Sequence, residues 1–90
     1  MKNVSSIQKQ VGEIEDFFIR IRPRDIMLPD YTLKYTEGNS TVGDWKLQFY
    51  EYYKNFDIEV DIVKDDEFQS IAADGEVLYD VRNTYLFQIK

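Results

Sequence analysis

The chain has 90 residues, the size of one small domain, and its 43% hydrophobic and 16% aromatic content is too high for an intrinsically disordered protein. Cysteine and histidine are both absent, which excludes disulfides, thiolate or imidazole metal ligands, and catalytic arrangements that need either residue. The net charge is −6, and because residues 1–25 hold five of the 11 bases and four of the 17 acids, residues 26–90 carry six bases against thirteen acids. We therefore expect residues 26–90 to be repelled by nucleic acid and by anionic membranes and to attract basic partners.

The amino-terminal segment has the clearest helical pattern. Apolar residues recur at spacings of three and four from Val4 to Ile21, which predicts an amphipathic helix. Ser5 followed by Gln8 matches a capping box at its start. Pro23 disfavours helical geometry at the preceding residue, so we expect the helix to end near Ile21.

Alternation of apolar residues predicts strands in the middle of the chain. Residues 31–37 alternate as a short strand with Tyr31, Leu33 and Tyr35 on one face, after a connector over residues 22–30. Residues 45–49 and 56–63 alternate in the same way, with a bend between them at residues 50–55. The aromatic residues Trp45 and Phe49 also recur at helical spacing, so a helix over residues 45–54 is the alternative.

The carboxyl-terminal segment keeps one parity of apolar residues from Val77 to Ile89, which predicts a single strand over residues 76–89, antiparallel to the strand at 56–63. Residues 66–73 fit either a short helix or a hairpin strand that turns at Asp74 and Gly75. The sequence thus predicts an α+β fold, in which an amino-terminal amphipathic helix packs on an antiparallel sheet of about four strands. We expect residues 1–90 to form a single domain.

A row of acids is the main candidate site. Asp57, Glu59 and Asp61 alternate along a predicted strand, which places their side chains on one face about 6.6 Å apart. Three further acids, Asp65, Asp66 and Glu67, follow directly. This row could seat a basic partner, imitate a phosphate backbone or bind a divalent cation, and it could also be the plain polar face of a strand. A calcium loop is excluded, because Ile62 and Phe68 stand where that loop needs glycine and glutamate.

Two further clusters adjoin this row. If residues 45–49 are a strand, Tyr50 and Tyr52 face outward beside the acids, as tyrosines at interface centres do. Arg20, Arg22 and Arg24 could hold a phosphate, but capping of the helix and local ion pairs are the simpler roles.

These patterns favour a small acidic intracellular protein-binding module. We expect an inhibitor or immunity-type protein that blocks a basic or nucleic-acid-handling partner, with nucleic-acid mimicry as one mode, through Asp57, Glu59, Asp61, Asp65, Asp66, Glu67, Tyr50 and Tyr52. The alternatives are a self-associating structural subunit, as a homodimer through the strand at 76–89, and a carboxylate-based enzyme or divalent-cation binder.

We expect no enzymatic activity, no cofactor, no metal site and no direct contact with nucleic acid. No apolar run reaches membrane-spanning length, and we find no secretory signal pattern, so we expect no membrane contact and a cytoplasmic location.

Overall fold

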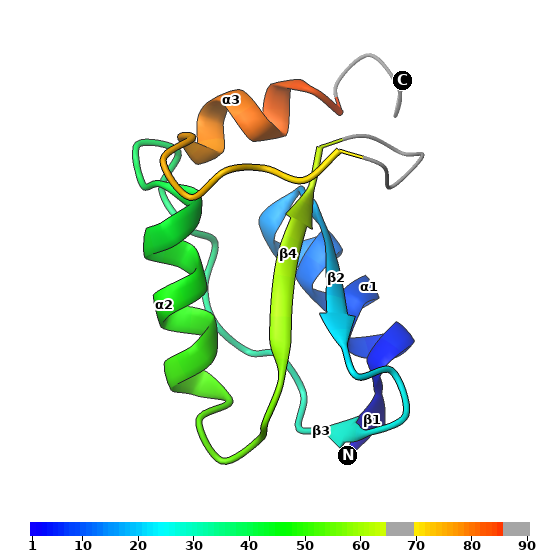
Figure 1. Cartoon of the computed structure of the whole chain (residues 1–90). Helices are drawn as coiled ribbons and strands as arrows, with labels where there is room; N and C mark the ends of the chain where they lie inside the picture. The colour runs from blue at the N-terminus through cyan, green and yellow to red at the C-terminus, as the bar shows by residue number, and fades with distance from the viewer. Residues whose placement is uncertain (65–69, 86–90) are drawn as a thin grey trace.

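The computed structural model describes residues 1–64 and 70–85, and it has the expected α+β fold with an amino-terminal helix and four strands (Figure 1). The strands form two antiparallel two-stranded sheets, β1 with β3 and β2 with β4. In chain order the elements are β1 (Lys2–Asn3), α1 (Val4–Glu15), β2 (Phe18–Arg22), β3 (Met27–Leu28), α2 (Val42–Tyr52), β4 (Glu59–Val63) and α3 (Leu78–Asn83).

Helix α1 begins where the apolar pattern predicted but ends earlier, so its predicted extension to Ile21 is wrong. Asn3 caps the helix, and its side chain accepts a hydrogen bond from the Ser6 N–H, so the predicted capping box at Ser5 is also wrong. The helix stops at Asp16, which has a left-handed φ of 63° and donates its N–H to the Gly12 carbonyl. Beyond this turn the chain continues as β2.

Residues 42–52 are helix α2, so the strand predicted over 45–49 is wrong and the helical alternative is correct. Thr41 and Asp44 form a capping box, in which each side chain bonds the other's backbone N–H. Trp45, Phe49 and Tyr53 are all buried at a spacing of four residues, which defines the inner stripe of the helix.

Two other predicted strands are also wrong. Residues 31–37 form no regular element, and Tyr35 is half exposed although Tyr31 is buried. Residues 78–83 of the predicted terminal strand are helix α3, so the edge that would have supported a homodimer is absent from this part of the described chain. Residues 86–89 of that strand lie outside the described residues.

The segment after β4 fits neither alternative in full: described residues 70–73 are not helical, and they pair with β4 rather than with a strand beyond the turn at Asp74 and Gly75. The Lys64 N–H donates to the Ser70 carbonyl and the Ala72 N–H to the Ile62 carbonyl, so residues 70–72 pair with the end of β4. A turn at Asp74 and Gly75 follows, closed by a hydrogen bond between residues 76 and 73. It leads into α3 rather than a strand, and residues 65–69 lie outside the described range.

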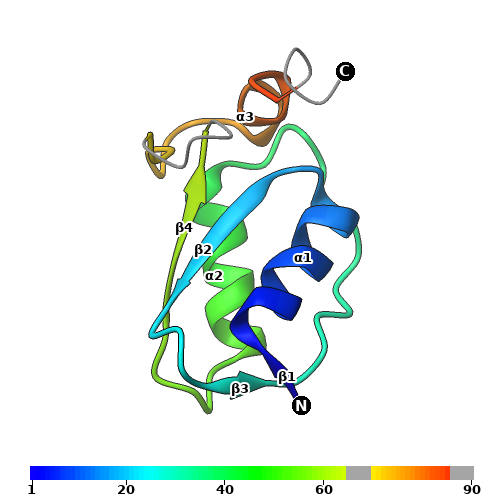
Figure 2. The same ribbon diagram turned by 90° about the vertical axis from the view of Figure 1, so that its right-hand side faces the viewer.

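The core lies between the β2–β4 sheet and helices α1 and α2, which are on the same side of that sheet (Figures 1 and 2). Ile19 pairs with Ile62 and Ile21 with Val60, and each of the four side chains is at most 2% exposed. The aromatic residues of α2 pack against this face, and Phe17 meets Trp45 edge to face with ring centroids 5.1 Å apart. The other face carries the charged side chains of both strands.

Side chains of the two helices accept a hydrogen bond from one backbone N–H on each outer edge of this sheet. The Ile21 N–H, on the edge of β2, donates to Oε1 of Gln8 in α1 at 2.8 Å. The Val60 N–H, on the edge of β4, donates to the hydroxyl of Tyr50 in α2 at 3.0 Å. These bonds occupy backbone groups that an uncovered edge would offer to another chain.

Candidate protein-binding surface

The acidic row lies on the face of β4 that points away from the core, opposite basic residues of β2. The register places Arg22 beside Glu59 and Arg20 beside Asp61. The Arg22 guanidinium bonds two of the three acids of the row, at 2.9 Å to Glu59 and 3.0 Å to Asp61. Its hydrogen bond to Glu59 and the charge of Asp61 raise the pKa of Arg22 above its usual value. Asp57 precedes the strand and is exposed.

Helix α2 adds a second cation to this row. Nζ of Lys46 lies 3.7 Å from Asp61 and 3.0 Å from Asp74, so a chain of ion pairs runs from Glu59 through Arg22, Asp61 and Lys46 to Asp74. The Asp61 side chain is only 17% exposed, whereas that of Glu59 is 72% exposed. Asp61 is therefore engaged inside the protein, and Asp57 with Glu59 forms the accessible end of the row.

The two tyrosines do not share a strand face with the acids, because they lie on a helix. The Tyr50 hydroxyl accepts from Val60, and the Tyr52 hydroxyl donates to the Asp30 carbonyl at 2.7 Å. Both side chains are half-buried, and both hydroxyls are occupied within the protein. Asp65, Asp66 and Glu67 lie outside the described residues.

Sequence reasoning missed a buried carboxylate at the centre of the protein. Glu15, the last residue of α1, is 0% exposed. Its carboxylate accepts five hydrogen bonds, from the Tyr31 hydroxyl, the Thr36 N–H and hydroxyl, the Trp45 indole and the Arg82 guanidinium. Glu15 stands four residues after the buried Val11, on the apolar stripe of α1. A charged residue at such a position was the available signal.

Arg82 completes this buried network from helix α3. Its guanidinium donates to the Glu15 carboxylate at 2.9 Å, to the Glu15 carbonyl at 2.6 Å and to the Thr36 carbonyl at 2.8 Å. The ring of Tyr35 lies over the same guanidinium, 4.0 Å from its central carbon. The network joins α1, the segment at residues 31–36, α2 and α3, and its groups are saturated by one another. We expect it to contribute to stability, because the loss of one partner would leave a buried charge unpaired.

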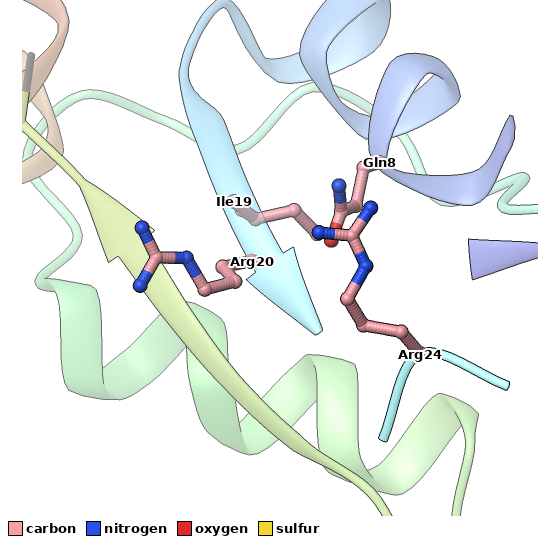
Figure 3. A pocket seen from close by; sticks show the side chains of 4 residues that line it. All are labelled: Gln8, Ile19, Arg20 and Arg24. Carbon is pink, nitrogen blue, oxygen red and sulfur yellow. The ribbon is translucent and has the colours of Figure 1, made fainter. Parts of the chain in front are cut away.

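The predicted arginine cluster does not converge on one point. A hollow of about 510 Å³ beside β2 is lined by Gln8, Ile19, Arg20 and Arg24. Figure 3 shows the Arg24 guanidinium beside Gln8 and the Arg20 guanidinium directed away from it, across β4. Arg22 pairs with the acidic row instead. Such divergent cations do not form a phosphate site.

The exposed charges are distributed unevenly. Within described residues 26–85, eight acids but only two bases, Lys34 and Lys54, are exposed. The acids are Asp30, Glu37, Asp44, Glu51, Asp57, Glu59, Asp74 and Asp80. Residues 1–25 expose four bases and three acids. The acidic excess read from the sequence is therefore a property of the surface and not only of the composition.

Five of these eight acids, Asp30, Glu37, Asp44, Asp57 and Asp80, form no ion pair with any residue in the described part of the chain. The described residues contain no group of three acids that could hold a metal ion. None of the described helices is long and apolar enough to cross a membrane.

No protein-family model matches the chain, and comparisons with curated proteins and with solved structures find no match either.

Proposed function

We propose that this protein is a small protein-binding module that acts through its acidic surface on a basic or nucleic-acid-handling partner, in the manner of an inhibitor or immunity-type protein. The observation that carries the proposal is the exposure of eight acids against two bases over described residues 26–85. Such a surface accelerates encounter with a basic partner and repels nucleic acid itself.

The accessible end of the acidic row, Asp57 and Glu59, supplies the charge that meets the partner. Asp61 has a different role, because it pairs with Arg22 of β2 and with Lys46 of α2. In this arrangement the partner's cations compete for the exposed carboxylate of Glu59 without dismantling the ion pairs below it. Mimicry of a phosphate backbone is one form of this mechanism.

The test uses a nona-arginine peptide as a minimal basic probe, titrated by calorimetry at low and at high salt. The double variant Asp57→Lys and Glu59→Lys should weaken binding about tenfold or more, because each reversal replaces an attraction by a repulsion. The matched control, Glu13→Lys with Asp25→Lys, makes the same change of charge on exposed residues of the amino-terminal part and should have a much smaller effect. Equal weakening by both variants, or no binding of the peptide at low salt, would refute the proposal.

A further inference from the structure

Two exposed tyrosines lie on chain segments that meet at the start of helix α3. Tyr35 is 52% exposed and Tyr79 is 64% exposed, so both are among the large side chains that the fold leaves open to solvent. The Tyr79 N–H donates to the Gly38 carbonyl at 2.9 Å, which fixes the start of α3 to the segment that carries Tyr35. Tyr79 also lies close to Gly38, because a Cβ atom added to Gly38 would lie 3.3 Å from the Cβ of Tyr79.

The guanidinium of Arg82 holds the ring of Tyr35 in place. Arg82 lies one helical turn after Tyr79, and its guanidinium covers one face of the Tyr35 ring at 4.0 Å. That guanidinium is itself held by the buried Glu15 carboxylate. One face of the Tyr35 ring is therefore covered and immobilised, while the side chain remains half exposed. A surface held in this way loses little conformational freedom when a partner binds.

Two acids adjoin these tyrosines in the sequence. Glu37 and Asp80 are both exposed, and neither forms an ion pair with a described residue. They differ in this from Glu59 and Asp61, which share the Arg22 guanidinium. The segments that carry these residues are joined by the bond from Tyr79 to Gly38, so two exposed aromatic side chains and two unpaired carboxylates belong to one region of the surface. Both kinds of group attract a planar cation.

We propose that Tyr35, Glu37, Tyr79 and Asp80, the tyrosine–acid surface, bind an arginine side chain of the basic partner. The guanidinium of that arginine stacks on an exposed tyrosine ring and donates hydrogen bonds to a carboxylate. This inference rests on the proposed function and adds a specific anchoring site to it. Tyrosine is among the residues that most often dominate the affinity at the centre of an interface. Charges at the rim mainly set the rate of encounter.

The experiment titrates the intact protein with nona-arginine and with nona-lysine, and follows backbone amide NMR signals to locate the contact. Nona-arginine should shift the signals of residues 35–38 and 79–82, and it should bind several-fold more tightly than nona-lysine, because an ammonium group does not stack. Tyr79→Ala should weaken nona-arginine binding about fivefold. Asp80→Asn, which preserves the side-chain shape, should weaken it about twofold to threefold.

The matched control is Leu47→Ala on α2, which truncates another exposed apolar side chain, 71% exposed, with Asp44 and Glu51 on the same helix face. It should leave the affinity unchanged. If Tyr79→Ala and Asp80→Asn both bind as the wild type does, while nona-arginine still shifts the signals of Asp57 and Glu59, the tyrosine–acid surface is refuted and the proposed function stands. If nona-arginine fails to bind at low salt, both are refuted.

Discussion

Replacement of Arg82 by methionine should destabilise the protein severely. Methionine has similar length but no charge, so the variant leaves the Glu15 carboxylate, which is 0% exposed, without its counter-ion. It also removes the donors to the Glu15 and Thr36 carbonyls. Breaking one partner of a buried ion pair costs about 3–5 kcal/mol. A 90-residue protein has a free energy of unfolding of about 5–13 kcal/mol, so the variant should lose at least a fifth of it.

Urea unfolding followed by Trp45 fluorescence measures this loss, because the Trp45 indole donates to the same carboxylate at 3.2 Å. Arg22→Met is the matched control, since it removes the same chemical group from a half-exposed side chain, and Asp61 keeps its ion pair with Lys46. This variant should leave the urea midpoint near that of the wild type.

A double-mutant cycle separates the ion pair from its surroundings. Glu15→Gln removes the charge from the other side of the pair and should also destabilise the protein, because it leaves the Arg82 guanidinium buried. The two losses should not add in the double variant Glu15→Gln with Arg82→Met, because no unpaired buried charge remains there. A loss below about 1 kcal/mol for Arg82→Met, or additive losses in the cycle, would show that the pair is not the central stabilising contact.

Two further predictions concern backbone strain and high pH. Asp16→Gly should raise the free energy of unfolding by about 0.5–1 kcal/mol in thermal melts, because glycine adopts the φ of 63° without strain, and Asp16→Ala should give no such gain. Burial raises the pKa of Tyr31 and of Tyr53 above the usual tyrosine value. The folded state therefore holds these protons more tightly than the unfolded state. Their contribution to the free energy of unfolding is fully present below pH about 10 and is lost as the pH rises further. Tyr53→Phe should flatten this alkaline decline in the urea midpoint, and an unchanged slope would contradict the assignment.

The end of α1 shows how a local pattern misleads. Phe17 and Ile21 continue the helical spacing of Val11 and Ile14, so the sequence alone predicted one long helix. In the structure the chain reverses at Asp16, and β2 buries Ile19 and Ile21 at alternate positions against β4. The partner strand lies about 40 residues further along the chain, and no window of a single helix contains it.

Helix α2 shows the converse case, in which the correct alternative was visible but not preferred. Trp45, Leu47 and Phe49 alternate as strand residues do, yet Leu47 is 71% exposed while Trp45 and Phe49 are fully buried. The local evidence that favours helix is the capping box of Thr41 and Asp44, just before the aromatic stripe. Burial against the sheet decides the matter, because only a helix turns Trp45, Phe49 and Tyr53 inward while it leaves Leu47 and Glu51 in solvent.

The sequence by itself determined the α+β class, the start of the first helix, the alternation along β4 and the acidic excess, because each depends on composition or on neighbours within a few residues. The tertiary structure alone decided which acids remain available. Glu59 and Asp61 meet Arg22 across the sheet, and Glu15 meets Arg82 from 67 residues away in the core. Asp57, Glu37 and Asp80 remain exposed and without an ion pair to any described residue. The sequence gives the number and order of the charged residues, but which of them pair depends on contacts that only the folded chain creates.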